Sequence, residues 1–366
     1  MSSLDGSLFD LASYDYFLPE ERIAQAPASP RDSSRLLVWS VRSGRVEHRF
    51  FRDIIDFLEP EDLLVLNDTR VLPARLLGMR SGGGFAEILL LEPAAPDFCL
   101  WKALVRPGRR LHPGSEVQVG DRMLKIEACE EEGTRLVRVG RGREDVLNFL
   151  DRFGKTPLPP YIHTDEGDWG DWKEAYQTIF ALREGSVAAP TASLHFTEEL
   201  LRRIEEKGVS KAWVTLHVGL GTFRPVKTSD IRAHVIHSEH CEVPSATAEA
   251  IVACRRRGGR VVAAGTTVAR ALESSADSEG HIIPGAQSTR LFIYPGFSFR
   301  VVNALLTNFH LPKSSLLMLV SAFAATLYCG EDEEQRALAD LRSLYECAIA
   351  ERYRFFSFGD AMFVQA

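Results

Sequence analysis

Paired cysteines and long apolar runs are both missing from this chain of 366 residues. Its six cysteines lie far apart and form no CxxC pair, which favours reduced, unliganded thiols over disulfides or zinc ligands. The most apolar stretch, LLMLVSAFAATLYC at residues 316–329, is shorter than the roughly 20 residues that cross a bilayer. We therefore expect a buried helix at this stretch, no membrane span and no redox chemistry at the cysteines.

The common motifs of nucleotide and acyl chemistry are missing as well. The chain contains no GxGxxG, Walker A, GxSxG or CxxxCxxC sequence, so dinucleotide, P-loop, hydrolase and radical-cluster chemistries lose support. The stretch MSSLDGSLFDLASYDY carries acids where an export signal has a basic and then an apolar region, and we expect a cytoplasmic protein. The formal net charge of −7 means that binding to nucleic acid requires a local basic patch.

Short β-rich runs separated by turn sequences occupy the chain from about Thr69 to Val139. They are ARLLGM, AEILLLE, LWKALV, SEVQV, LKIEA and RLVRV, with turns such as RSGGG and RPGRRLHPG between them. This spacing predicts a small antiparallel β-barrel. The span 70–113 holds seven Lys or Arg against three acids, which suits either phosphate contacts or a solvated, charged barrel edge.

Helix and strand patterns alternate in the rest of the chain. Strands are expected at RLLVWS, DLLVLN, KAWVTLHV, RVVAAG, LFIYPG and NALLTN, and helices at LPEERIAQ, TEELLRRIEEKG, TTVARALES, after Pro312 and from about Glu333 to Arg352. Such alternation in a chain of this length predicts an α/β fold with a mostly parallel sheet and helices on both faces, together with a second domain.

One strand ends in a polar turn, TLHVGLGTFRPV. Alternation places Thr215 and His217 on one face of the strand, and His217 lies at its carboxyl end, where ligands bind in open α/β sheets. Gly219 and Gly221 allow a tight turn and a close approach to a ligand, and Arg224 supplies a charge. The alternative is a structural turn with a buried, hydrogen-bonded histidine.

Two further segments place polar groups at helix starts. In VAAPTASLHFTEEL, His195 precedes a helix N-terminus, whose N–H groups can lower a histidine pKa and leave a neutral base. Its alternative role is packing beside the helix cap. In VVAAGTTVARALE, Thr266 and Thr267 follow a strand and a glycine, an arrangement that can bind an anion but is common in α/β proteins.

The segment IRAHVIHSEHCEV contains His234, His237 and His240, which raises the possibility of a metal site. Spacing argues against it, because His237 points away from the other two on a strand and the three do not share a face on a helix. We interpret His237 and Glu239 as a polar pair on one strand face, able to hold a ligand hydroxyl or assist proton transfer.

Eleven motifs in one order resemble the S-adenosylmethionine:tRNA ribosyltransferase-isomerase family, and the resemblance runs essentially from end to end. They are FLPEERIAQAP with RDSSRLLV, DLLVLNDTRVLPARL, GKTPLPPYI, YQTIFA, GSVAAPTASLHFT, TLHVGLGTFRPV, HVIHSEH, AAGTTVARALES, FIYPGFSF, NALLTNFHLPKSSLLMLVSAFA and YRFFSFGDAMF. Ser193 and Asn303 depart from the family pattern, which has glycine and aspartate there.

The resemblance implies an α/β catalytic domain of residues 1–69 and 146–366, with a β-barrel domain of residues 70–145 inserted. It implies transfer of the ribosyl part of S-adenosylmethionine to 7-aminomethyl-7-deazaguanine at the wobble position of a tRNA with a G-U-N anticodon. Isomerisation then gives epoxyqueuosine, with release of adenine and methionine. No metal or redox cofactor is expected, S-adenosylmethionine is a co-substrate, and we expect a monomer. The alternatives are a methyltransferase using S-adenosylmethionine and a non-catalytic tRNA-binding protein.

The resemblance also assigns candidate residues to three roles. The acid/base candidates are His195, His217, His237, Glu239 and Asp68. The candidates for holding S-adenosylmethionine or the modified base are Gly219, Gly221, Thr222, Arg224, Thr266 and Thr267. The candidates for tRNA phosphates are Arg70, Arg75, Lys102, Arg106 and Arg109.

Overall fold

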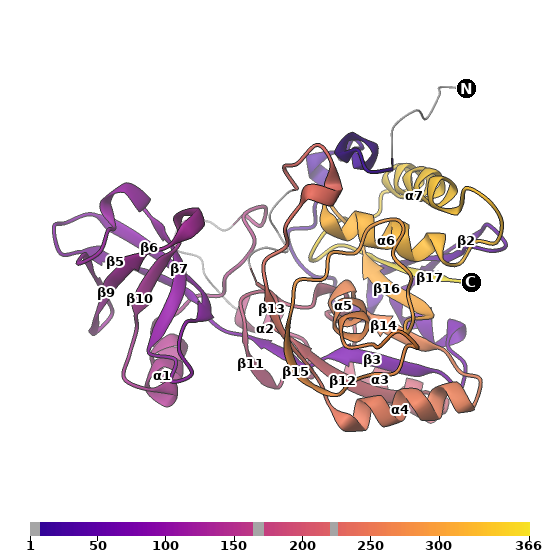
Figure 1. The fold of residues 1–366 in the computed structure, drawn as a ribbon, viewed down its shortest axis with the longest axis horizontal. Coiled ribbons are helices and arrows are strands. Elements are labelled where there is room, and N and C mark those ends of the chain that lie inside the picture. The colour runs from indigo at the N-terminus through magenta and orange to yellow at the C-terminus, as the bar shows by residue number, and fades with distance from the viewer. Residues whose placement is uncertain (1–7, 164–171, 220–225) are drawn as a thin grey trace.

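A nine-stranded sheet forms the centre of the larger part of the molecule (Figure 1). The computed structural model describes residues 8–163, 172–219 and 226–366. In spatial order the strands are β15 (Gly285–Thr289), β13 (Glu239–Val243), β12 (Ser210–Leu216), β3 (Leu63–Asn67), β14 (Val261–Ala264), β16 (Ala304–Asn308), β17 (Ala361–Gln365), β1 (Arg35–Ser40) and β2 (Arg45–Phe50).

The middle of this sheet is parallel and its flanks are mixed. Strands β12, β3, β14 and β16 run in one direction, whereas β13 and β15 add to one side as antiparallel strands. On the other side β17 reverses against β16, pairs in parallel with β1, and β1 forms a hairpin with β2. The predicted α/β fold is confirmed, and the sheet is mixed: its centre is parallel as expected, but four of its eight neighbouring strand pairs are antiparallel.

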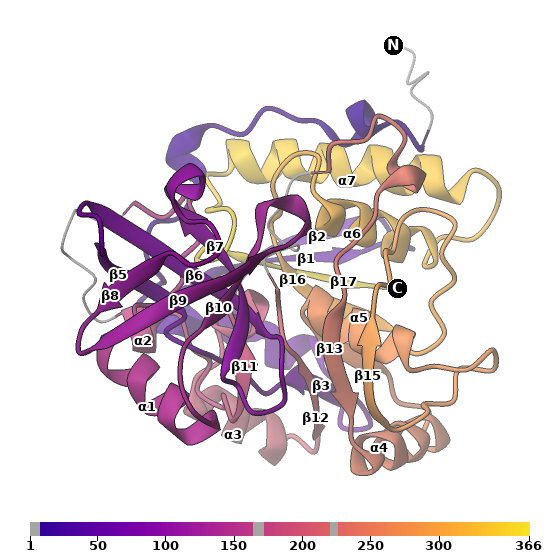
Figure 2. The same ribbon diagram turned by 60° about the vertical axis from the view of Figure 1, so that its left-hand side comes forward.

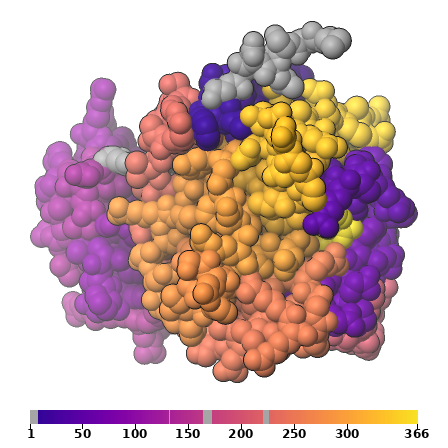
Figure 3. Space-filling model, turned by 45° about the vertical axis from the view of Figure 1, so that its right-hand side comes forward, coloured from indigo at the N-terminus to yellow at the C-terminus, as the bar shows by residue number. Residues whose placement is uncertain are grey.

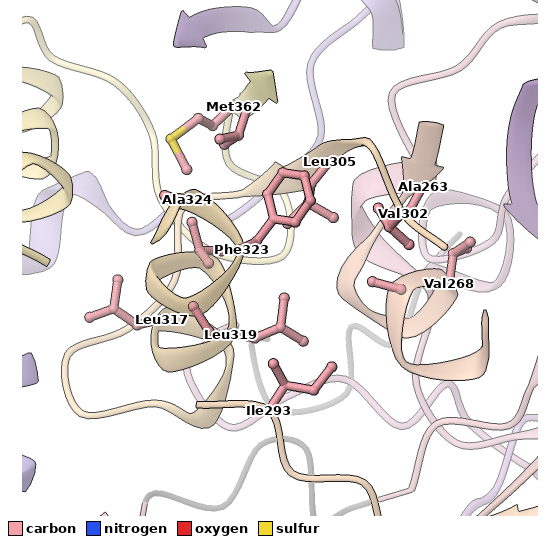
Figure 4. Close-up of a cluster of buried hydrophobic side chains, with 14 of the residues drawn as sticks. Ala263, Val268, Ile293, Val302, Leu305, Leu317, Leu319, Phe323, Ala324 and Met362 are labelled. Carbon is pink, nitrogen blue, oxygen red and sulfur yellow. The ribbon is translucent and has the colours of Figure 1, made fainter. Parts of the chain in front are cut away.

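Helices cover both faces because alternate strand residues are apolar on both sides. One face, including Leu63 and Val65, packs against α4 (Ser245–Arg256), α5 (Thr266–Ser274), α6 (Ser315–Ala325) and α7 (Glu333–Ala350). Figure 4 shows part of this layer. The opposite face, including Leu64 and Leu66, packs against the 3-10 helix η4 (Phe51–Phe57) and α3 (Glu198–Glu206). The continuous apolar runs of the central strands therefore reflect burial on both faces.

The predicted barrel is confirmed as a closed, six-stranded antiparallel structure. Its strands are β5 (Arg75–Arg80), β6 (Phe85–Pro93), β7 (Leu100–Arg106), β8 (Glu116–Val119), β9 (Arg122–Cys129) and β10 (Arg135–Arg138). Inward residues such as Ile88 and Trp101 form its core, to which α1 (Arg143–Phe153) adds Val146 and Phe149. The barrel projects from one side of the sheet, as the space-filling view of Figure 3 also shows.

A small parallel pair connects the two parts. Strands β4 (Thr69–Val71) and β11 (Arg183–Ser186) pair with each other, and Figures 1 and 2 both place β11 between the barrel and the large sheet. The remaining short elements are the helix α2 (Trp172–Ala175) and the 3-10 helices η1 (Leu11–Tyr14), η2 (Glu20–Arg22), η3 (Arg31–Ser33), η5 (Gly108–Arg110), η6 (Glu131–Gly133), η7 (Thr191–Ser193) and η9 (Ile231–Ala233).

Two of the predicted elements are wrong. The segment LPEERIAQ forms only the single 3-10 turn η2, because Ile23 and Ala24 then extend to pair with Phe355. The segment LFIYPG is irregular, and the nearby strand is β15, which precedes it. The expected buried helix at residues 316–329 is confirmed as α6. Among the helices in the described ranges, none has the length and apolar character of a bilayer-spanning segment.

Candidate active site

The polar residues predicted at strand ends meet at one edge of the sheet. Because β3, β12, β14 and β16 are parallel, their carboxyl ends share this edge, and Asp68, His217 and Thr266 follow them closely. Strand β13 runs the other way beside β12, so its first residue, Glu239, lies at the same edge. We call this the carboxyl edge (Figure 2).

Asn67 fixes the geometry of the carboxyl edge and was missed by the sequence analysis. Its Nδ2 donates to the carbonyl oxygen of Leu216 at 3.0 Å and to Thr267 Oγ1 at 3.4 Å. Its Oδ1 accepts from the backbone N–H groups of Leu216, at 3.0 Å, and Thr69, at 3.1 Å. One fully buried amide thus ties the end of β3 to β12 and to the start of α5.

Asp68 faces the predicted polar side of β12. Its Oδ1 accepts a hydrogen bond from Thr215 Oγ1 at 2.6 Å, and the residue is only 9% exposed. Burial raises the pKa of Asp68, while the bond from Thr215 and the charge of Arg183 act in the opposite direction. This carboxyl group therefore holds a proton more readily than an exposed aspartate does.

The side chain of His217 contacts Thr69, the residue after Asp68. Its Nδ1 is 2.8 Å from Thr69 Oγ1, and its ring stacks on His240 with centroids 5.7 Å apart. The other nitrogen, Nε2, lies against Gly185, where an added Cβ would come within 2.6 Å of it. The predicted common face of Thr215 and His217 is confirmed, because both side chains contact the segment that follows β3.

The surroundings of His217 keep its ring neutral. Burial is the largest cause that lowers its pKa to about 4, followed by the charges of His240, Arg143 and Arg183. Arg183 stands opposite Thr69 in the β4–β11 pair, and Arg143 opens α1 beside it, with Nη2 3.9 Å from Glu184 Oε2. The sequence analysis did not select either arginine.

His195 is buried next to the ends of β1 and β16. Its Nδ1 is 2.8 Å from Ser34 Oγ and its Nε2 is 3.4 Å from Asn308 Oδ1, while its ring stacks on Phe51. Burial lowers its pKa to about 4. A neutral His195 is as expected, although the main cause of its lowered pKa is burial and not the helix that follows it. Both ring nitrogens face partners within the protein, as the packing alternative requires.

The two residues that depart from the family pattern occupy different edges. Ser193 is fully buried at the carboxyl edge, where its Oγ donates to the carbonyl oxygen of Ala264 at 3.3 Å. Asn303 precedes β16 at the opposite edge, and its Oδ1 accepts from Val261 N–H at 2.9 Å. The missing aspartate charge at position 303 is therefore remote from the carboxyl edge.

Glu239 forms a buried ion pair with Arg270, a residue that the sequence analysis missed. Oε2 accepts from Arg270 Nη1, and Oε1 accepts from Gly219 N–H at 3.1 Å. Both side chains are only 4% exposed. The predicted strand-face pairing with His237 is wrong, because β13 begins at Glu239 and His237 lies in the preceding loop. Both residues nevertheless line one pocket.

The remaining histidines of that segment make separate contacts. The ring of His234 packs edge-on against Phe292 with centroids 5.2 Å apart, whereas His240 stacks on His217. Within the described ranges, no group of three or more His, Cys, Asp or Glu residues is placed to hold a metal ion.

The predicted ligand-binding residues are only partly described. Thr266 and Thr267 are buried and open α5 behind Gly265, whose φ of +110° favours glycine. Gly219 lies beside Glu239 at the carboxyl edge. Three other candidates, Gly221, Thr222 and Arg224, lie outside the described residues.

The basic candidates for tRNA contact differ in how exposed their side chains are and in whether they already pair with an acid. Arg75 donates to the carbonyl oxygen of Leu158 and lies 3.3 Å from Glu87, with 20% of its side chain exposed. Lys102 pairs with Glu92 at 2.8 Å near the surface. Arg106 and Arg109 of the barrel are exposed, and so is Arg70 in β4.

The molecule thus combines an α/β sheet, which has carboxylates and neutral histidines at its carboxyl edge, with a β-barrel that carries exposed arginines. The chain matches the family model described as "Queuosine biosynthesis protein" over residues 11–364. It is 52% identical to the S-adenosylmethionine:tRNA ribosyltransferase-isomerase of Gloeobacter violaceus over 96% of this chain and 95% of that protein. It is 49% identical to the enzyme of the same name from Acaryochloris marina, over 97% and 93%. A crystal structure of S-adenosylmethionine tRNA ribosyltransferase from Thermotoga maritima is similar, with a TM-score of 0.53, 37% identity and coverage of 96% and 99%. The chain belongs to the queuosine biosynthesis protein family.

Proposed function

We propose that this protein is an S-adenosylmethionine:tRNA ribosyltransferase-isomerase. It transfers the ribosyl part of S-adenosylmethionine to the aminomethyl group of 7-aminomethyl-7-deazaguanine at the wobble position of tRNA. Isomerisation then gives epoxyqueuosine, and adenine and methionine leave. The similarity to enzymes of that name over nearly the full chain supports the reaction, and the convergence of Asp68, His217 and Glu239 at one edge supports its location.

The reaction requires a base that is neutral at physiological pH. A sulfonium group acidifies the neighbouring C5′ protons, the substrate amine must be neutral to attack, and departing adenine gains from a proton. His217, with its pKa lowered to about 4, is present as the free base at pH 7. It has one ring nitrogen oriented by Thr69, which is the arrangement that a positioned base needs.

The other acid/base candidates have supporting roles in this proposal. His195, also neutral at pH 7, is the second base candidate. Asp68, whose pKa is raised by burial, is a candidate proton donor for a leaving group. Glu239 and His237 orient the substrate from their common pocket.

Binding of the two substrates is assigned to separate parts of the molecule. Gly219, Gly221, Thr222, Arg224, Thr266 and Thr267 hold S-adenosylmethionine or the modified base, and Arg70, Arg75, Lys102, Arg106 and Arg109 contact tRNA phosphates. We propose that the substrates are tRNAs with a G-U-N anticodon, that the protein acts as a monomer in the cytoplasm, and that no metal or redox cofactor takes part.

The deciding experiment is incubation with S-adenosylmethionine and tRNA that carries the aminomethyl base, followed by chromatography of the small products. We expect free adenine and methionine in equal amounts, and none with a matched tRNA that carries guanine at the wobble position. Formation of S-adenosylhomocysteine would instead identify a methyltransferase. Intact S-adenosylmethionine with bound tRNA would identify a non-catalytic binding protein.

A further inference from the structure

Two exposed arginines, one in α1 and one in β11, lie near His217 where the large sheet meets the barrel (Figures 1 and 2). Arg183 stands directly opposite Thr69 in the β4–β11 pair, and the hydroxyl group of Thr69 contacts His217 at 2.8 Å. Opposite residues in a β-ladder point to the same face, so the side chain of Arg183 lies on the face that carries His217. Arg143 is the first residue of α1, and its Nη2 lies 3.9 Å from Oε2 of Glu184, the residue after Arg183.

Both arginines are held in place and remain accessible to a ligand. The backbone N–H of Arg183 donates to the carbonyl oxygen of Asp68 at 3.0 Å, which fixes this part of β11 against the carboxyl edge. The guanidinium group of Arg143 lies over the ring of Phe98, 4.3 Å from its centroid, and its side chain is still 51% exposed. A guanidinium group that is already ordered loses little freedom when it binds an anion.

The two arginines carry more positive charge than their surroundings offset. Over the described ranges, Arg183 forms no ion pair with a carboxylate, and Glu184 approaches Arg143 only to 3.9 Å. After burial and His240, the charges of Arg143 and Arg183 lower the pKa of His217, which places both guanidinium groups close to its ring. A surplus of positive charge at an accessible site favours the binding of an anion.

A nucleotide suits this surface better than an isolated carboxylate does. Leu182, the residue before Arg183, is 70% exposed, and enzymes that act on a base hold it between aromatic or apolar side chains. Helix α1 packs into the barrel core, so Arg143 continues the basic surface of the barrel towards His217. The anion that an RNA brings to this place is a phosphodiester group.

We propose that Arg143 and Arg183 bind a phosphodiester group that flanks the modified nucleotide of tRNA, and that they thereby hold its aminomethyl group at His217. Guanidinium groups suit this task because their planar N–H groups match the oxygen atoms of a phosphate. Leu182 supplies the apolar contact for the same nucleotide. The inference rests on the proposed function, since that function supplies the tRNA.

The test removes the charge of one phosphate and of one arginine, separately and together. Two tRNAs that carry the aminomethyl base are assembled from synthetic fragments, with a neutral methylphosphonate on the 5′ or on the 3′ side of the modified nucleotide. In the adenine-release assay, one of these replacements should lower kcat/KM of the unchanged protein by about tenfold. Arg183→Gln should cause a similar loss with the unmodified backbone, as should Arg143→Gln. Each variant should lose less than about a further twofold with that methylphosphonate tRNA, because the contact is already absent.

Losses that multiply to about a hundredfold at both phosphates would show independent effects and overturn the proposal. The matched control is Arg256→Gln, at an exposed arginine of α4, which should keep full activity and full sensitivity to the methylphosphonate. If the loss in Arg183→Gln instead disappears with decarboxylated S-adenosylmethionine, this arginine binds the carboxylate of the donor, which would also overturn the proposal. Absence of adenine with the unchanged protein and the unmodified backbone would refute the proposed function instead.

Discussion

The burial of His195 predicts that this residue makes the folded protein sensitive to acid. In the folded state its pKa is about 4, against an ordinary value of 6.5, so between these values the unfolded chain binds more protons at this site. The stability that it contributes is fully present above about pH 6.5 and is lost as the pH falls towards 4. From pH 7 to pH 5 the loss from this one group is about 2 kcal/mol.

The variant His195→Gln removes the titrating group and keeps an amide that can bond to Ser34 and Asn308. The free energy of unfolding of both proteins should be measured by urea denaturation at pH 7 and pH 5, with tryptophan fluorescence as the signal. The variant should be less stable at pH 7, but its loss between the two pH values should be smaller by about 2 kcal/mol. With a denaturant slope of about 3 kcal/mol per molar, the midpoint shifts should differ by about 0.7 M.

The other buried histidines are present in both proteins, so their contributions cancel in this comparison. The matched control is His163→Gln, the same substitution at a histidine whose side chain is 73% exposed. A difference below about 0.5 kcal/mol between wild type and His195→Gln would mean that His195 binds protons equally well in the folded and unfolded chains, which would refute the argument from burial.

Three further predictions concern the site and the barrel. His217→Ala should abolish turnover but leave the Kd for S-adenosylmethionine within about tenfold, or about 1.4 kcal/mol, in calorimetry; normal turnover would exclude a role as the base. Gly185→Ala should push the ring of His217, from which the new Cβ would lie 2.6 Å away, and lower kcat by about a hundredfold. Gly142→Ala, with a similar φ but open space, should keep its activity, and equal activity of the two variants would contradict the steric argument. Charge reversal of Arg106 and Arg109 should weaken tRNA binding and reduce its salt dependence; an unchanged salt slope in filter binding would identify a solvated barrel edge.

The elements that the sequence predicted well are those whose pattern depends on near neighbours in the chain. Alternation and regular turns identified all six barrel strands, and the glycine–threonine start identified α5. The segment LFIYPG was mistaken for a strand because its apolar residues report burial, and Ile293 is indeed 1% exposed. Its backbone is irregular, and the carbonyl oxygen of Leu291 is used instead by Arg270.

The parts of the site that the sequence did not predict depend on partners that are distant along the chain. Asn67 acquires its role from Leu216 and Thr267, and no local motif distinguishes it from other polar residues after a strand. In the sequence, Arg270 is only a polar residue in a helix rich in apolar residues. Its ion pair with Glu239 forms only when the fold brings β13 beside α5. Conversely, Asp68 and His217 were predictable because the carboxyl ends of parallel strands must meet.

The β4 strand connects the large sheet to the barrel, and its position links the two parts of the molecule. The chain passes from the large sheet into the barrel through β4, and the same segment carries Asp68 and Thr69, which contact Thr215 and His217. A rotation of the barrel about this connection would twist the backbone that orients the proposed base. In the proposed function tRNA contacts the barrel, so the segment that carries the barrel is also the segment that holds the proposed base His217 in place.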